Sequence, residues 1–178
     1  MDRLRQRLRQ SLKRPTVQDW RQTVMVLGAY GAIALPLALH YDLFNWSPWP
    51  ANQFLSWAGL NLILGKFLLP ALAEELLFRV LLLPHPSETV RRRTMLFWLG
   101  VSWVLYIASH PLNALTVFPR GNPTFLSPVF LSLAGLLGLA CSVLYRQTGS
   151  LWAIALVHWL VVVVWLGFGG GEALLVGS

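Results

Sequence analysis

The stretch that decides the fold runs from Ala71 to Leu83 and reads ALAEELLFRVLLL. It holds two adjacent carboxylates and one arginine inside an apolar run of membrane-spanning character. An ionisable side chain at membrane depth costs about 3 kcal/mol on insertion scales, so such a residue usually marks a functional site. Glu74, Glu75 and Arg79 therefore predict a buried polar site inside the membrane.

The spacing of these three charges predicts different surroundings for them. Glu75 and Arg79 are four residues apart and share a helix face, with the acid on the N-terminal side, as an ion pair prefers. Glu74 lies about 100° away around the helix, because an α-helix has about 3.6 residues per turn. Arg79 can neutralise one carboxylate, which leaves the other without a partner nearby in the sequence. We expect the chemistry at that remaining carboxylate.

The composition of the chain is that of a membrane protein. Its 178 residues are 56% hydrophobic and only 12% charged, whereas an ordinary soluble domain has about 25% charged residues. Several of the nine tryptophans lie near the ends of apolar runs, as an interfacial aromatic belt requires. We therefore predict an all-α, polytopic membrane protein. The single cysteine, Cys141, excludes an intrachain disulfide.

Five apolar segments are long enough to be compared with the roughly 20 residues that a helix needs to cross the hydrocarbon core. We predict about five transmembrane helices in a protease-like domain of residues 22–168, followed by a Gly-rich C-terminal tail, 169–178. The second segment is long and is interrupted by Pro70. The five segments are 22–41, 54–83, 95–111, 127–145 and 150–168.

Residues 1–21 form a basic segment that contains seven of the fourteen Lys and Arg residues. Leu4, Leu8 and Leu12 recur every four residues, so the segment is interpreted as a solvated tail or as a helix on an anionic membrane surface. A cleaved signal peptide is disfavoured because no small-x-small site follows the first apolar run. Nucleic-acid binding is disfavoured because aromatic residues are not interleaved with the basic ones.

The distribution of positive charge predicts the orientation of the spans. If the N-terminus is cytoplasmic and five spans alternate, eleven basic residues lie on the cytoplasmic side and only Arg120 lies on the other. We therefore predict a multi-pass protein of the cell membrane with a cytoplasmic N-terminus. Topology then explains the net charge of +7, without a nucleic-acid partner.

Two histidines, His110 and His158, are each the only titratable side chain deep in their span. A lone helix histidine is more often a packing residue with satisfied hydrogen bonds than a catalyst. Two of them, together with Glu74, Glu75 and Arg79, favour a catalytic site. A carboxylate with an imidazole can activate water, and a second imidazole can stabilise an oxyanion. Glu74, His110 and His158 are also a ligand set for zinc, although our first expectation is no cofactor.

The order of these residues resembles the motifs of the CPBP intramembrane proteases, the relatives of the CAAX prenyl endopeptidase and of bacteriocin-processing enzymes. Three motifs on successive spans are matched, within residues 55–168, by Glu74-Glu75-x-x-x-Arg79, Tyr106-x-x-x-His110 and His158. The first motif, with Phe78 before the arginine, is the specific part. The resemblance implies an intramembrane endopeptidase that acts on membrane-associated peptides or proteins.

The resemblance also implies a role for each matched residue. Glu74 is expected to activate the hydrolytic water, which His110 helps to hold. Glu75 and Arg79 are expected to support the geometry of the site, and His158 to stabilise the oxyanion.

Two residues depart from the family's pattern. Tyr106 stands where the second motif commonly begins with Phe, and Val162 stands where the third motif usually has Asn. Asn61 or Asn113 would have to supply the missing amide. The second departure favours an alternative function, a weak or inactive relative that acts as a membrane scaffold, chaperone or immunity factor. A proton-coupled transporter is disfavoured because the five spans show no repeat symmetry.

The predicted spans place the site residues at different depths. Glu74 lies about nine residues from Pro84, and His110 lies about sixteen from Thr94, a mismatch of about 10 Å at 1.5 Å per residue. We expect the third span to begin before Thr94, with Ser87 as its N-cap.

Overall fold

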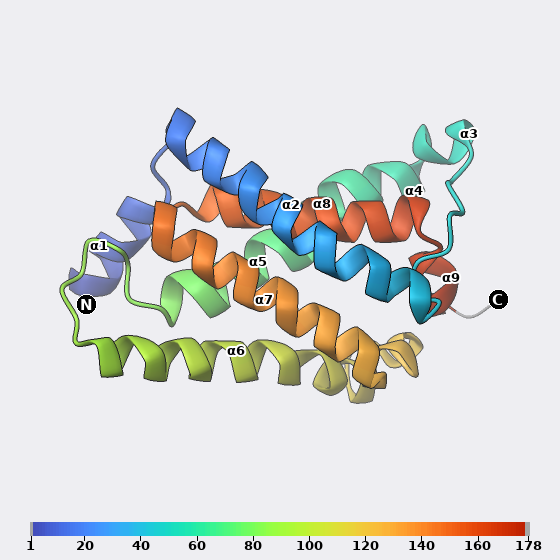
Figure 1. Ribbon diagram of the computed structural model, residues 1–178. Coiled ribbons are helices and arrows are strands. Elements are labelled where there is room, and N and C mark those ends of the chain that lie inside the picture. The colour runs from blue at the N-terminus through green and yellow to red at the C-terminus, as the bar shows by residue number, and fades with distance from the viewer. Residues whose placement is uncertain (1, 177–178) are drawn as a thin grey trace.

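The computed structural model describes residues 2–176 and is a bundle of helices, with α1 at one end and α9 at the other (Figure 1). Four of its helices are long and apolar enough to cross a membrane. Within the described residues the only strand-like pairing joins Ser47 to Gly169. The prediction of an all-α, polytopic membrane protein is confirmed. The four long helices are α2 (Val17–His40), α6 (Arg92–Leu115), α7 (Pro128–Thr148) and α8 (Leu151–Phe168).

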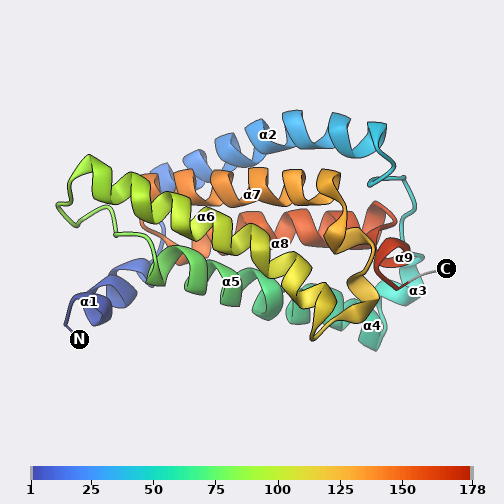
Figure 2. The same ribbon diagram turned by 90° about the horizontal axis from the view of Figure 1, so that it is seen from below.

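The second apolar segment crosses the bundle as a series of short helical pieces (Figure 2). The helix breaks at Leu69, whose φ of −136° and ψ of 116° are not helical. Pro70 follows directly, and proline restricts the residue before it to extended conformations. The five predicted crossings are therefore four continuous helices and one broken path. Its pieces are α3 (Ala51–Phe54), α4 (Trp57–Leu60), η1 (Asn61–Gly65), η2 (Phe67–Leu72), α5 (Ala73–Glu75) and η3 (Leu76–Leu81).

The piece that follows the two glutamates is a wide helical turn of the π type. This geometry belongs to η3, whereas η2, which precedes α5 and its two glutamates, contains the break at Leu69. Wide turns of this kind are rare in proteins and are frequent at functional sites. The stretch that stood out by its charge therefore also stands out by its backbone.

The N-terminal segment is divided between two helices. Residues Asp2–Ser11 form α1, and α2 begins at Val17, before the predicted boundary at residue 22. Thr16 caps α2, because its hydroxyl accepts from the Asp19 N–H while the Asp19 carboxylate accepts from the Thr16 N–H at 2.7 Å. Such a reciprocal capping box satisfies two backbone donors that a helix start leaves free.

The third span begins before Thr94, as expected, but its predicted N-cap is wrong. The helix α6 begins at Arg92, and Ser87 does not cap it. The backbone N–H of Ser87 instead donates to His85 Nδ1 at 3.2 Å, and its hydroxyl donates to Gln10 Oε1 at 2.5 Å. The link 82–91 carries the chain outward from the end of η3 before α6 begins (Figure 2). This outward link accommodates the depth mismatch.

The loops sort to the two ends of the bundle. At one end, Arg7 of α1 contacts Glu88 of the link 82–91, and Arg146 Nη1 donates to the Pro84 carbonyl at 2.8 Å. At the other end, Ser47 N–H donates to the Phe168 carbonyl. The hydroxyl of Thr124, before α7, donates to the Leu174 carbonyl in α9 (Gly171–Val176). The three basic segments of the sequence, which are residues 1–21, Arg91 to Arg93 and Arg146, thus lie at one end of the bundle.

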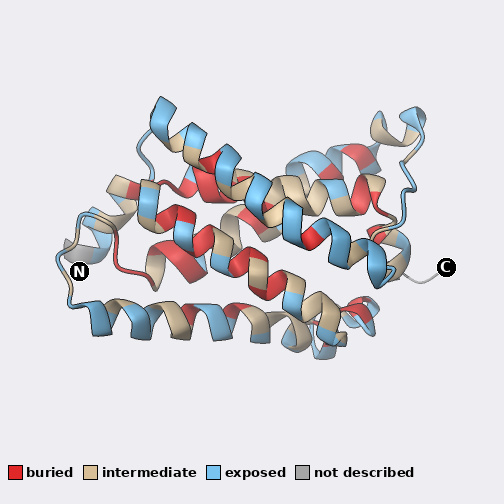
Figure 3. Ribbon diagram, in the orientation of Figure 1, coloured by how far each residue is buried: buried red, intermediate tan, exposed pale blue. Residues whose placement is uncertain are grey.

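The buried core lies along α7, α8 and the broken segment, whereas α2 and α6 are mostly exposed (Figure 3). Half of the α7 span is buried, against 11% of the α2 and α6 spans. Val80, Leu144 and Ile154 are fully buried in this core. In a bilayer, lipid covers the apolar faces that α2 and α6 leave open, because a helix satisfies its own backbone polar groups.

Candidate active site

Glu75 is the buried centre of the polar cluster. Its Oε1 accepts from Arg79 Nη1 at 3.2 Å and lies 2.8 Å from Nδ1 of His158, which comes from α8. The side chains of Glu75 and Arg79 are both fully buried. A buried charge is tolerated only when it is paired and hydrogen-bonded, and Glu75 has two such partners. The ion pair expected from the four-residue spacing is present, and His158 joins it.

Arg79 connects the site segment to α6 and α7. Its Nη2 donates to the Gly138 carbonyl at 2.9 Å, and its guanidinium carbon lies 4.2 Å from the centre of the Tyr106 ring. An arginine stacked on an aromatic ring at this distance makes a favourable cation–π contact. A Cβ atom at position 138 would lie 2.8 Å from Nη2 of the arginine. Only glycine therefore leaves room for this arrangement.

Glu74 has different surroundings from its neighbour. Its Oε2 lies 4.0 Å from His158 Nε2, and its side chain is 20% exposed where that of Glu75 is fully buried. This oxygen has no hydrogen-bond partner among the described residues, and neither have Glu75 Oε2 and Arg79 Nε. Buried polar atoms without partners are rare and call for an explanation. Three of the four such atoms in the described residues belong to Glu74, Glu75 and Arg79.

The imidazole of His158 lies between the two carboxylates. Its Nδ1 faces Glu75 and its Nε2 faces Glu74, and the residue is 2% exposed. A carboxylate accepts hydrogen bonds, so the proton of the short contact belongs to Nδ1. The Nε2 atom is then left to face Glu74.

His110 approaches the same region from α6. Its Nδ1 donates to the Tyr106 carbonyl at 3.0 Å, which leaves Nε2 without a partner on its own helix. The Tyr106 ring centre lies 5.1 Å from that of His110 and 6.0 Å from that of His158. Ser102 fixes α6 against the site segment, because its hydroxyl donates to the Phe78 carbonyl at 2.6 Å. Tyr106 thus lies between the two histidines.

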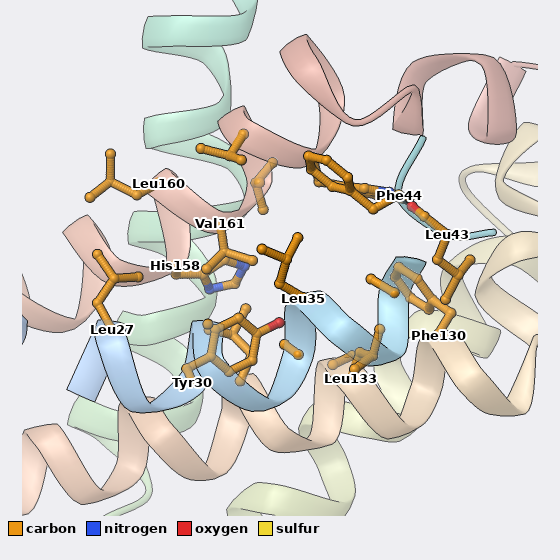
Figure 4. Close-up of a pocket in the computed structure, with 18 of the residues that line it drawn as sticks. Leu27, Tyr30, Leu35, Leu43, Phe44, Phe130, Leu133, His158, Leu160 and Val161 are labelled. Atoms are coloured by element: carbon orange, nitrogen blue, oxygen red, sulfur yellow. Dashed lines mark hydrogen bonds between the residues drawn. The ribbon is translucent and has the colours of Figure 1, made fainter. Parts of the chain in front are cut away.

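A mostly apolar cavity of about 410 Å³ lies beside the histidines (Figure 4). Helices α2, α7 and α8 supply most of its walls, and Tyr106, His110 and His158 line it where it meets the site. Glu74, Glu75 and Arg79 are not among the lining residues. The cavity therefore meets the polar cluster on its histidine side.

Two lining residues bear on the sequence predictions. Val162, which stands where an amide was expected, lies on the cavity wall. Neither Asn61 nor Asn113 lines the cavity. Tyr30 of α2 also lines the cavity. Sequence reasoning missed it, because a single tyrosine in an apolar span gives no signal beyond packing.

The zinc hypothesis finds no ready ligand set. Among residues 2–176, no group of three or more His, Cys, Asp or Glu side chains is placed to hold a metal ion. Glu74 and His158 approach each other, but they form no such group with His110. The residues therefore do not fit a three-ligand zinc site as they stand.

The model of the family described as type II CAAX prenyl endopeptidase Rce1-like matches residues 56–164. The chain belongs to this family. The match confirms the resemblance to the CAAX-type proteases and covers the segment from α4 to α8, including Glu74 and His158. No curated protein and no solved structure matches the chain significantly. As an Rce1-like family member, the chain is a CAAX-type intramembrane protease at the family level and a multi-pass membrane protein.

Proposed function

We propose that this protein hydrolyses peptide bonds of membrane-associated substrates, with Glu74 as the general base that activates water. The observation that carries the proposal is Glu74 Oε2, which has no partner among the described residues and faces His158 Nε2 at 4.0 Å. A carboxylate with a free oxygen can take a proton from water. Glu75 is a poorer candidate, because Arg79 and His158 already engage its charge.

The proposed reaction begins when Glu74 takes one proton from water and the resulting hydroxide attacks the scissile carbonyl carbon. The carbonyl oxygen becomes an oxyanion, which a donor placed in advance stabilises. Glu74 then returns its proton to the leaving amine as the C–N bond breaks. One water molecule is consumed, and both protons of that water end on the products.

His158 is the proposed donor to the oxyanion. In its cationic form, Nδ1–H is held by Glu75 and Nε2–H is free to donate. The proposed step requires an imidazole that carries a proton on each ring nitrogen, so that Nε2–H can reach the oxyanion while Glu75 holds Nδ1–H. Glu75 and Arg79 then act as positioning residues that hold the imidazole. The free Nε2 of His110 is the proposed second acceptor for the attacking water.

We also infer that the protein resides in the cell membrane with its N-terminus in the cytoplasm. The three basic segments lie at one end of the bundle, where Arg7 and Arg146 contact the link 82–91. Positively charged loops remain on the cytoplasmic side during insertion. The cavity, which His110 and His158 line, is the proposed route of the substrate to the site.

The test of the proposed function compares membrane proteomes of cells that express the native protein or its Glu74→Gln variant. New protein termini are expected with the native protein and are expected to be lost with Glu74→Gln. The matched control is Asp42→Asn, which changes an exposed carboxylate at the end of α2 and is expected to leave the termini unchanged. Unchanged termini in a folded Glu74→Gln protein would rule out Glu74 as the base.

A second candidate function follows from Val162, which gives the cavity wall a methyl surface next to His158. An inactive relative that acts as a membrane scaffold, chaperone or immunity factor does not stabilise an oxyanion. It therefore needs no amide at position 162 to donate a hydrogen bond beside His158. This function predicts that the native protein generates no new termini, and that Glu74→Gln cells keep any phenotype of the native protein. Metal analysis of the purified protein tests the zinc version, which requires stoichiometric zinc and loss of cleavage with chelators.

A further inference from the structure

Tyr30 is a polar residue of the cavity to which no role has been given. It lies near the middle of α2, and its ring and hydroxyl point into the cavity on the side where His158 lies (Figure 4). The other α2 residues that line the cavity are glycine, alanine and leucine. No hydrogen bond joins the Tyr30 hydroxyl to the other side chains drawn there.

A hydroxyl that faces an apolar cavity without a hydrogen bond favours any occupant of the cavity that can accept one. A buried polar group without a hydrogen bond loses about 1–3 kcal/mol relative to a satisfied one. At a protein surface, bulk water forms hydrogen bonds with such groups. The hydrocarbon core of a bilayer contains no water that could do so. The hydroxyl of Tyr30 therefore has hydrogen-bonding capacity that the described residues around the cavity do not use.

The proposed substrate would bring groups that need such a donor. A peptide bond must leave its helix before water can attack it, and its neighbouring carbonyls then lose their helical hydrogen bonds. Each carbonyl without a partner at membrane depth costs several kcal/mol. Most of the cavity wall consists of aliphatic side chains such as Leu35, Leu133 and Val161, which cannot donate.

We propose that Tyr30 is a substrate-binding residue, whose hydroxyl donates a hydrogen bond to a backbone carbonyl of the unwound peptide segment in the cavity. This inference rests on the proposed endopeptidase function. Tyr30 lies outside the matched residues 56–164, so α2 becomes part of the substrate site in addition to spanning the membrane. The bonded carbonyl is one that flanks the scissile bond, because the base and the oxyanion donor serve the scissile bond itself.

The test is the Tyr30→Phe variant, which keeps the ring and removes only the hydroxyl. The probe is a synthetic peptide that spans a cleavage point found in the proteome comparison, presented in vesicles with the purified protein. We expect kcat/KM to fall about 3- to 10-fold, the size of one hydrogen bond. The loss is expected in KM with kcat nearly unchanged, because a flanking carbonyl carries the same charge in the ground and transition states.

Two controls separate binding from folding. Tyr41→Phe alters an exposed tyrosine just beyond α2 and is expected to leave kcat and KM unchanged. The melting temperature of Tyr30→Phe is expected to equal or exceed that of the native protein, because no internal hydrogen bond is lost. A lower melting temperature with the same loss of kcat/KM would instead assign Tyr30 a structural role and overturn the inference.

The outcomes for Tyr30 and for Glu74 are distinguishable. Unchanged KM in Tyr30→Phe, together with abolished cleavage in Glu74→Gln, would overturn the inference and leave the proposed function standing. Cleavage that persists in Glu74→Gln would remove the proposed function itself. A loss of cleavage in Glu74→Gln with a raised KM in Tyr30→Phe supports both.

Discussion

Glu74 and Glu75 are adjacent and chemically identical, yet their surroundings differ in kind. Glu75 is bonded to Arg79 and His158 and is fully buried. Glu74 keeps an oxygen without a partner among the described residues. The difference arises from the rotation of about 100° between neighbouring helix positions. One glutamate thus faces the arginine on its own helix, and the other faces outward from that pair.

This difference predicts that two conservative substitutions lower the free energy of unfolding by very different amounts. Glu75→Gln removes one charge of a buried pair and leaves Arg79 uncompensated, which costs about 3–5 kcal/mol. Glu74→Gln removes no hydrogen bond from Oε2 and is expected to change stability by less than about 1 kcal/mol. Thermal unfolding of the two purified variants measures the effect. Equal destabilisation of both variants would contradict the proposed division between a positioning residue and a base.

At the residue scale, the sequence was informative where a contact is local. The spacing of Glu75 and Arg79 predicts their ion pair, because residues four apart meet on any helix. The contact of His158 with Glu75 joins residues 83 positions apart, and no spacing rule identifies which glutamate a distant histidine meets. Ser87 failed as an N-cap for a related reason. A serine hydroxyl serves a turn as readily as a helix start, and here it bonds to Gln10.

At the scale of elements, α1 makes a contact that neither interpretation of the basic N-terminal segment includes. Arg7 binds Glu88 through two hydrogen bonds of 2.7 and 3.0 Å and donates a third, at 2.9 Å, to the Leu81 carbonyl. Leu81 is the last residue of η3, and the carbonyls at a helix end lack helical partners. The helix α1 therefore fastens the end of the segment that carries the glutamates. Its leucine spacing suggested a helix but not this partner.

The attachment of α1 is expected to depend on pH through two groups outside the spans. Burial raises the pKa of Glu88, but the hydrogen bonds from Arg7 and from the His85 N–H outweigh burial and hold the pKa below 4.5. Burial lowers the pKa of His85 below 6.5, with further lowering from Arg146 and Arg7 and opposition from the Gly149 backbone and Glu88. Both groups thus have a folded pKa below the unfolded one. Their contributions to stability are present above the unfolded pKa and are lost as the pH falls through the folded one.

The expected result is an attachment that is constant above pH 6.5, weakens as His85 gains its proton, and weakens again below pH 4.5. Amide hydrogen exchange in α1, corrected for the intrinsic rate, measures it. Glu88→Gln is expected to remove the lower step and to speed exchange in α1 at neutral pH. The matched control, Glu172→Gln in α9 at the opposite end of the bundle, is expected to leave α1 unaffected. Identical exchange in both variants would contradict the fastening contact.

At the scale of the whole molecule, hydropathy predicted the four long apolar helices but not the form of the broken second segment. Four apolar segments became continuous helices, since a lone helix satisfies its own backbone in lipid. Pro70 signalled the interruption of the remaining segment, but the wide turn of η3 has no sequence signature. This turn packs against α1, α6 and α7, which come from distant parts of the sequence. The cavity was beyond sequence reasoning as well, because its wall combines α2, α7 and α8, whose approach depends on how the helices pack.

The two-ended arrangement of the loops predicts which positions share a side of the membrane. The chain's only cysteine, Cys141, is fully buried, so a cysteine introduced on the surface can be labelled selectively. Thr89 in the link after η3 and Gln147 at the end of α7 lie at the α1 end, and exposed Val117 lies at the other. A membrane-impermeant maleimide is expected to label Val117→Cys in intact cells, and to label Thr89→Cys and Gln147→Cys only after permeabilisation.

Labelling with the sides exchanged would reverse the orientation inferred from positive charge, without contradicting the arrangement of the helices in the bundle. Labelling of Thr89→Cys and Gln147→Cys from opposite sides would contradict the bundle itself, because Arg146 and Pro84 hold these two links together.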